Sequence, residues 1–218
     1  MRTSSDFDAH YGTKDPWGLK HASRRDRALG EIIGPHVDGH SVLELGCGEG
    51  HLTATIFAKA RSVTGIDISS VAVSRAQALG LPHAHFEVSD FLTVGLRGYD
   101  VIAAVECLYY LSAAEQDAFL QRLAREHDGI FILSAPIIGA NEHRTYYTHS
   151  GIVQMLARHG FSVLEWRNLN AYWKAGIGGA AAAAMTRLPF ADALVPYLPE
   201  ALVYQRCYVS RPAKSRPA

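Results

Sequence analysis

Three glycines at alternate positions give the first chemical indication in the sequence. Residues 42–50 read Val-Leu-Glu-Leu-Gly-Cys-Gly-Glu-Gly, so an apolar run leads directly into Gly46, Gly48 and Gly50. Glycine adopts backbone angles that other residues avoid, and it lets a ligand lie directly against the main chain. A helical pattern follows, and the N–H groups at a helix start attract polar and anionic ligands. The segment therefore predicts a ligand-binding turn between a buried strand and a helix.

The spacing of the glycines separates two classes of ligand. The dinucleotide-binding fingerprint Gly-x-Gly-x-x-Gly requires a third glycine at position 51, where this chain has His51. The pattern Glu-x-Gly-x-Gly-x-Gly that starts at Glu44 instead resembles the first motif of class I S-adenosylmethionine (SAM)-dependent methyltransferases. This resemblance implies that four residues of the motif contact SAM: Glu44, Gly46, Cys47 and Gly48.

An acidic residue ends the second apolar run of the sequence. Doubly wound folds place an acid at the end of the second strand, where it accepts hydrogen bonds from the ribose hydroxyls of a nucleotide. Asp67 holds that position, with Ile68 next to it. The structural alternative for Asp67 is a helix N-cap, but Ser69 or Ser70 can supply the cap. We therefore expect Asp67 and Ile68 to contact the cofactor.

A second acid, Asp90, follows the apolar run 84–88. In the methyltransferase pattern this acid accepts the exocyclic amine of adenine, and the residue after it lies along the adenine ring. The resemblance thus implies that Asp90 and Phe91 hold adenine, while the capping of a turn is the structural alternative for Asp90.

The run 101–105 predicts a buried strand, and Glu106 comes directly after it. Ligands bind at the carboxyl ends of the strands in open α/β sheets, so Glu106 should face the active cleft. An amine must be neutral before it attacks a methyl group, and three residues could take its proton: Glu106, His143 and His149. Alternatively, Glu106 only positions the charged end of the cofactor. The sequence does not choose between these roles.

Aromatic side chains near the predicted cleft are candidates for binding the methyl acceptor. Tyr109 and Tyr110 follow the fourth predicted strand, and Tyr146 and Tyr147 lie in the polar loop 135–150. Loops on a rigid scaffold are the usual place for substrate contacts. We therefore expect all four tyrosines to contribute to the acceptor site.

The first 20 residues contain Tyr11 and Trp17 in a segment that Pro16 and Gly18 make irregular. Methyltransferases commonly fold such a leader over the cofactor. The resemblance thus implies that Trp17 contacts the cofactor and that Tyr11 contacts the acceptor. Anchoring of the leader on the surface of the domain is the structural alternative.

The composition is that of a globular protein without a bias towards nucleic acid. Hydrophobic residues make up 48% of the 218 residues, and 21 basic residues balance 21 acidic ones. Cys47, Cys107 and Cys207 are too scattered for a disulfide framework and fit a reducing cytoplasm. Neither a signal peptide nor a membrane span is expected. His83 and His85 lack a third ligand, so no metal site is predicted.

Apolar runs and helical patterns alternate along the chain. The predicted strands cover residues 42–45, 62–67, 84–88, 101–105, 130–134, 161–166 and 201–209. The predicted helices cover residues 23–33, 70–79, 113–126 and 150–159, the last with Ser150 as its N-cap. This alternation predicts an α/β fold with a doubly wound, mostly parallel, seven-stranded Rossmann-like sheet and right-handed crossovers.

We expect residues 1–218 to form one domain with three additions. The first is an N-terminal helical leader or lid at 1–35. The second is a helical insertion at 170–199, which could cover the site or form a homodimer contact. The third is a flexible tail at 211–218.

Three segments together narrow the resemblance to one branch of the class I methyltransferases. Asp15-Pro16-Trp17, the glycine turn and the run Glu-Cys-Leu-Tyr-Tyr-Leu at 106–111 are similar to the nodulation N-methyltransferase (NodS-like) branch of class I methyltransferases. The resemblance covers most of residues 7–168, but regions 135–150 and 170–199 depart from it. It implies methyl transfer from SAM, with S-adenosylhomocysteine (SAH) as product, to an amine or hydroxyl of a small metabolite, sugar or glycoconjugate. A catalytically inactive SAM-binding or assembly protein is the alternative.

Overall fold

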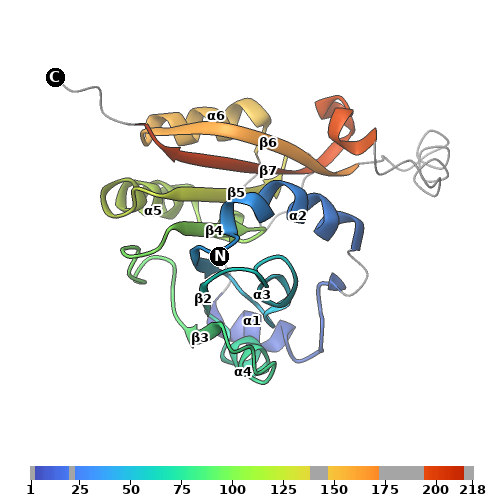
Figure 1. Ribbon diagram of the computed structural model, residues 1–218, viewed down its shortest axis with the longest axis vertical. Helices are drawn as coiled ribbons and strands as arrows, with labels where there is room; N and C mark the ends of the chain where they lie inside the picture. Colours follow the sequence, from blue (N-terminus) through green and yellow to red (C-terminus); the bar gives the residue numbers. More distant parts are fainter. Residues whose placement is uncertain (1–2, 20–22, 138–146, 172–193, 214–218) are drawn as a thin grey trace.

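The computed structural model describes residues 3–19, 23–137, 147–171 and 194–213, and its centre is a seven-stranded sheet (Figure 1). The strands are β1 (Ser41–Leu45), β2 (Ser62–Asp67), β3 (Ala84–Val88), β4 (Val101–Val105), β5 (Ile130–Pro136), β6 (Phe161–Ala171) and β7 (Val203–Pro212). They lie in the order β3-β2-β1-β4-β5-β7-β6. Strands β1 to β5 pair in parallel, and β7 is antiparallel to β5 and to β6. The doubly wound, mostly parallel sheet is therefore confirmed.

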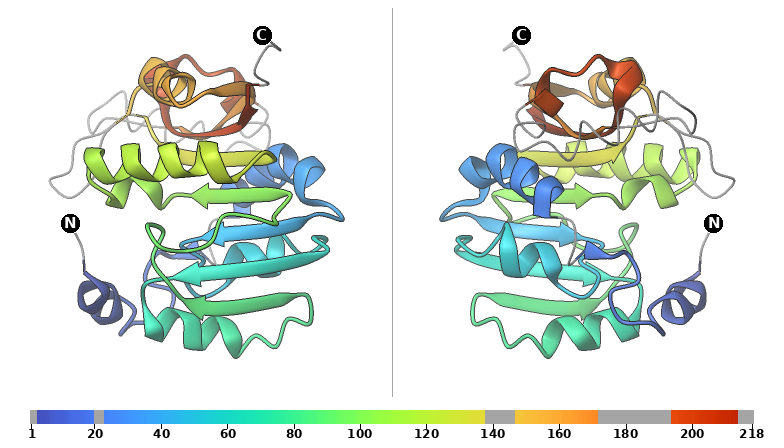
Figure 2. Two further views of the ribbon diagram at one scale, coloured as in Figure 1. Left: turned by 90° about the vertical axis from the view of Figure 1, so that its left-hand side faces the viewer. Right: turned by 90° about the vertical axis from the view of Figure 1, so that its right-hand side faces the viewer.

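Helices cover both faces of this sheet (Figure 2). The helices are α1 (Ser4–His10), α2 (Ser23–Val37), α3 (His51–Thr55), α4 (Ser70–Gln77), α5 (Ala113–Glu126) and α6 (His149–Arg158). Short 3₁₀ turns follow at η2 (Leu108–Tyr110), η3 (Val195–Tyr197) and η4 (Glu200–Leu202). Helices α2 and α3 pack on one face and α5 and α6 on the other, whereas α1 lies beyond the carboxyl ends of the parallel strands (Figure 2). No helix in the described ranges has the length and apolar character to cross a membrane.

Alternation along the central strands divides the core into two layers. Val42 of β1 packs with Leu29 and Phe57 on the face of α2 and α3. Leu43, the next residue, packs with Phe119 on the face of α5 and α6. Every residue of β1 and of β4 is buried, as expected for parallel strands that are covered on both faces. Both faces of β1 and β4 are therefore used for packing, so a ligand can reach these two strands only at their ends.

Several predicted boundaries are wrong. Helix α6 begins at His149 and not after Ser150, because the extended backbone of Thr148 lets its hydroxyl accept the Gly151 N–H at 3.0 Å. Strand β6 continues to Ala171, since it pairs with β7 over its whole length. Strand β7 begins at Val203, after turn η4, and ends at Pro212, so residues 211 and 212 belong to the sheet and not to a tail.

The leader contains a helix, as predicted, because residues 4–10 form the short helix α1. Thr3 and Asp6 make a capping box at its start, in which each side chain accepts the backbone N–H of the other residue. The segment around Pro16 is irregular, as predicted. Most of the predicted insertion, residues 172–193, lies outside the described residues, and so does 214–218 of the predicted tail.

Arg122 of α5 holds the loop that follows β3. Its guanidinium donates hydrogen bonds to the carbonyl oxygens of Phe91 at 3.1 Å and Val94 at 2.5 Å, and also to that of Leu92. These carbonyls would otherwise lack partners in a part-buried loop, and an unpaired buried carbonyl is costly. One side chain therefore fixes the backbone that carries Asp90 and Phe91.

We expect Arg122→Met to lower the free energy of unfolding by about 2–4 kcal/mol, since hydrogen bonds from a charged donor are lost. Urea unfolding followed by circular dichroism measures this change. Arg125→Met is the matched control, because Arg125 lies on the same helix but is exposed. Equal effects of the two substitutions would contradict the role assigned to Arg122.

Candidate functional site

A cavity of about 640 Å³ opens at the carboxyl ends of β1, β2 and β4. The direction of the crossovers reverses between β1 and β4, and ligands of open α/β sheets bind at such a point. Of the predicted cofactor contacts, the following line the cavity: Trp17, Gly46, Gly48, Asp67, Ile68, Asp90, Phe91 and Glu106. Of the predicted acceptor contacts, Tyr11, Tyr109 and Tyr110 line it. His143 and Tyr146 lie outside the described residues.

The glycine turn is shaped by close contacts. Gly46 has a φ of 68°, and a Cβ atom there would lie 2.8 Å from the Cβ of Cys107. Gly48 has a φ of 54°, and a Cβ there would lie 2.7 Å from the hydroxyl oxygen of Tyr11. Both positions therefore require glycine for the backbone angle and for space.

Asp67 is 7% exposed and lies beside the turn. Its two carboxylate oxygens accept the backbone N–H groups of Gly48 and Ser69, each at 2.9 Å. Burial raises the pKa of Asp67, and these two hydrogen bonds oppose the shift. Ser69 supplies the N-cap of α4, as predicted, which leaves Asp67 facing the cavity.

Asp90 serves partly as a turn cap, because its Oδ1 accepts the Leu92 N–H at 2.9 Å. The residue also lines the cavity, so this contact does not turn it away from a ligand. The ring of Phe91 reaches the glycine turn, where its Cζ would lie 3.4 Å from a Cβ at Gly46. Both residues after β3 therefore face the same space as the turn.

The leader closes one side of the cavity. The hydroxyl of Tyr11 accepts a hydrogen bond from Nε1 of Trp17 at 3.0 Å, and Tyr11 is only 4% exposed. Burial raises the pKa of Tyr11, with the nearby Asp67 carboxylate as a second cause. The ring of Phe7 meets that of Tyr110 edge-on at 5.3 Å between centroids. The leader is thus packed against the site from two directions.

Two polar contacts attach the leader to the sheet side of the cavity. Asp8 accepts the Ser69 hydroxyl at 2.6 Å, which lowers the pKa of Asp8. Further along, the Asp15 N–H donates to Glu49 at 3.0 Å, and Glu49 pairs with Arg75 at 2.5 Å. The second contact joins the leader to the glycine turn itself and to α4.

Glu44 does not line the cavity, in contrast to its predicted role. It is 1% exposed, and its carboxylate accepts a hydrogen bond from the hydroxyl of Thr53 on α3. Burial raises its pKa to about 8, with the Asp67 charge as a lesser cause. The strand alternation explains this position, because Glu44 points to the same face as Val42 and away from the strand end. Glu44 therefore supports the glycine turn indirectly, through its hydrogen bond to α3, the helix that follows the turn.

Three other predicted residues also lie away from the cavity lining. Cys47 is 5% exposed and packs with Val73 and Phe86 under the turn. Tyr147 donates its hydroxyl proton to Gln116 at 2.7 Å inside the core. His149 stacks on Tyr208, with ring centroids 5.7 Å apart, so it is not placed as a base for the cavity.

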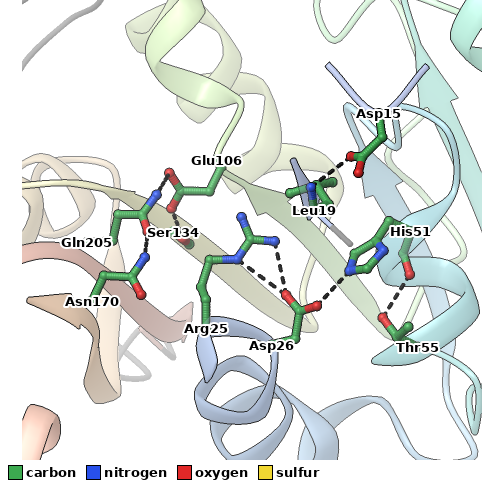
Figure 3. Close-up of polar contacts among 10 residues, drawn as sticks. All are labelled: Asp15, Leu19, Arg25, Asp26, His51, Thr55, Glu106, Ser134, Asn170 and Gln205. Carbon is green, nitrogen blue, oxygen red and sulfur yellow. Dashed lines mark hydrogen bonds and ion pairs between the residues drawn. The ribbon is translucent and has the colours of Figure 1, made fainter. Parts of the chain in front are cut away.

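Glu106 occupies a strained position at the end of β4. Its φ is 59°, a left-handed conformation that is uncommon for non-glycine residues and is enriched at functional sites. Its carboxylate accepts hydrogen bonds from the hydroxyl of Ser134 and from Nε2 of Gln205, the latter at 2.7 Å (Figure 3). Neither partner was predicted, because both contacts depend on how distant strands pair.

A charged cluster at the edge of the cavity was also missed. Asp26 of α2 bonds Nε2 of His51 at 2.6 Å and the guanidinium of Arg25 at 3.0 Å (Figure 3). Arg25 and His51 line the cavity. No local pattern signals this cluster, because Asp26 and His51 lie 25 residues apart in the chain.

Comparison with known proteins agrees with this geometry. Residues 42–126 match the family model described as a methyltransferase domain. The chain is 25% identical to nodulation protein S of Azorhizobium caulinodans over 173 residues, which cover 76% of this chain and 82% of that protein.

Solved structures share the fold. Magnesium protoporphyrin IX methyltransferase from Synechocystis PCC 6803 with bound SAM superposes with a TM-score of 0.67 over 98% of both chains, at 16% identity. The 1,6-didemethyltoxoflavin-N1-methyltransferase of Burkholderia thailandensis gives a TM-score of 0.66 at 18% identity, over 97% of this chain and 87% of that one.

Replacing Glu44 by glutamine should change how stability depends on pH. The carboxyl ionises near 4.5 when unfolded and near 8 when folded, so the folded state holds its proton more tightly between these values. Stability of the parent should therefore fall as pH rises through this window. We expect Glu44→Gln to gain about 1–4 kcal/mol relative to the parent between pH 5 and pH 8.5, measured by urea unfolding. If the free energies of unfolding of the parent and of Glu44→Gln changed with pH in parallel, the raised pKa of Glu44 would be contradicted.

Proposed function

We propose that this chain, a class I SAM-dependent methyltransferase, transfers the methyl group of SAM to an amine or hydroxyl of a small metabolite, sugar or glycoconjugate. One observation carries the proposal. The glycine turn, the buried Asp67 and the loop of Asp90 meet around one cavity at the carboxyl ends of the strands. A cavity lined by aromatic rings with a few charged groups suits a small ligand.

We assign to each part of SAM a partner among the residues that line the cavity. The proposed partner of the ribose hydroxyls is the Asp67 carboxylate, and that of the adenine amine is Asp90, with Phe91 along the ring. Gly46 and Gly48 line the same cavity, and their backbone is the proposed contact of the methionine portion. Arg25 also lines the cavity. Its guanidinium is the proposed partner of the SAM carboxylate, because the two groups match in shape and charge.

Catalysis of this reaction depends more on the positioning of the acceptor than on covalent chemistry by the protein. The acceptor lone pair attacks the methyl carbon in line, the C–S bond breaks towards sulfur, and a neutral thioether leaves as SAH. Holding the acceptor at near-attack distance can contribute about 7–11 kcal/mol. The leader, with Tyr11 and Trp17 against the turn, would exclude water from this step.

The resemblance to the nodulation N-methyltransferase branch favours an amino group as the acceptor. Regions 135–150 and 170–199, which are expected to depart from that branch, would set the choice of acceptor. The inactive alternative predicts loss of the acid that holds ribose. Asp67 is present, buried and hydrogen-bonded beside the turn, which favours an active enzyme.

Asp67→Ala should weaken SAH binding by about 1.5–3 kcal/mol, or roughly 10–150-fold, because the ribose hydroxyls lose a charged acceptor. Calorimetric titration with SAH measures the loss, and circular dichroism checks that the variant folds. Since burial raises the pKa of Asp67, parent affinity should also decline on acidification at higher pH than for an exposed aspartate. Asp67→Asn should lack this decline. Unchanged affinity in folded Asp67→Ala would refute the assignment.

Methyl transfer itself is tested with labelled SAM and a panel of amines, phenols and amino sugars, read by mass spectrometry. We expect the label on at least one small amine or hydroxyl compound. Label that appears only on protein or nucleic acid would overturn the proposed acceptor class. Tight SAH binding with no transfer to any compound, including a metabolite extract, would favour the inactive alternative.

A further inference from the structure

A chain of hydrogen bonds runs from the cavity to the far edge of the sheet. Glu106 of the β4 end accepts a hydrogen bond from Gln205 of β7, and Gln205 accepts one from Nδ2 of Asn170 on β6 (Figure 3). Asn170 and Gln205 are direct partners in the antiparallel pair of β6 and β7. Gln205 is 9% exposed and lines the cavity beside Glu106. Gln205 therefore holds the Glu106 carboxylate directly, and Asn170 contributes through Gln205.

The hydrogen bonds in this network run in one direction, from Asn170 through Gln205 to Glu106. Asn170 presents its N–H₂ group to the oxygen of the Gln205 amide, so the Gln205 N–H₂ group must face Glu106. The hydroxyl of Ser134, which is fully buried, donates to the other oxygen of Glu106. Both carboxylate oxygens of Glu106 therefore accept a hydrogen bond, an arrangement that favours the ionised form.

The position of the carboxylate is as constrained as its donors. The left-handed backbone at Glu106 aims the side chain out of the strand direction, and its N–H donates to the Ser134 carbonyl at 3.0 Å. A strained residue keeps such a conformation only where its surroundings hold it. Ser134 and Gln205 supply that support from β5 and β7, the two strands beyond β4.

We propose that Gln205, oriented by Asn170, is a positioning residue that sets the Glu106 carboxylate to bind a protonated amino group of the methyl acceptor. This inference rests on the proposed function and deepens it. The rings of Tyr110 and Trp17, whose centroids lie 6.3 Å apart, line the same cavity as Glu106, and aromatic rings attract cations. An alcohol carries no positive charge, so neither the Glu106 carboxylate nor the aromatic rings would attract it in this way.

The protons balance for such an acceptor. The bound R–NH₃⁺ gives one proton to Glu106 and becomes R–NH₂, whose lone pair attacks the methyl carbon of SAM. The C–N bond forms as the C–S bond breaks towards sulfur, which yields R–NH₂CH₃⁺ and SAH. Glu106 then returns its proton to solvent, so one proton is released in each turnover.

The test compares two probes of similar shape, benzylammonium and benzyl alcohol, in NMR titrations of the SAH-loaded protein at pH 7. We expect the parent to bind benzylammonium about tenfold more tightly, the factor for a hydrogen bond to a charged group. Glu106→Gln should abolish this preference. Gln205→Leu removes the donor, and Asn170→Asp reverses the Gln205 amide, so each should reduce the preference at least about threefold. SAH affinity should stay at the parent value in all three variants.

Gln77→Leu is the matched control. Gln77 of α4 donates to the Phe86 carbonyl at 2.9 Å and is tied to the fold but not to the cavity. It should lower thermal stability and leave the charge preference intact. Should Gln205→Leu fail to fold, Asn170→Asp answers the same question without changing Gln205.

Three results would overturn the inference. The parent could bind both probes equally, Gln205→Leu and Asn170→Asp could keep the parent preference, or Glu106→Gln could weaken SAH as much as benzylammonium. The last result would assign Glu106 to the charged end of the cofactor. Absence of SAH binding in the parent would instead refute the proposed function. The two probes can then be compared in the ligand-free protein, so the two failures are distinguishable.

Discussion

The close approach of Gly46 to Cys107 governs the geometry of the site. With 2.8 Å between the side-chain position of Gly46 and the Cβ of Cys107, the ends of β1 and β4 meet without room for another atom. The turn must therefore use a left-handed backbone, which directs Gly48 beneath the Tyr11 hydroxyl. The same contact brings Glu106 next to the turn. A methyl group at Gly46 would displace all of these features together.

The parts of the site that follow a local pattern could be predicted from sequence. The turn, Asp67 and Asp90 each end an apolar run, and parallel strands bring their carboxyl ends to one edge. Glu44 departs from its predicted role because the alternation of side chains along β1, and not the position in the motif, decides which way it points. Its neighbours Leu43 and Leu45 pack on the opposite face from Val42, so alternation alone turns Glu44 towards α3.

The parts that depend on pairing across the sheet could not be predicted. Gln205 reaches Glu106 only because β7 inserts antiparallel between β5 and β6, and no local signal specifies that register. His149 does not reach the cavity because of a local difference in where α6 begins. A shift of the helix start from Ser150 to the Thr148 cap brings His149 into the first turn and onto Tyr208.

The position of β7 between β5 and β6 has a consequence for the order of assembly during synthesis. The first five strands can pair as the ribosome delivers them, because each parallel neighbour is already present. Strand β6 has no partner in the sheet other than β7, among the described residues, and must wait for the last strand. Gln205 arrives with that strand. A nascent chain can therefore form the glycine turn and its carboxylates well before Glu106 gains its support, so the polar network is the last part of the site to mature.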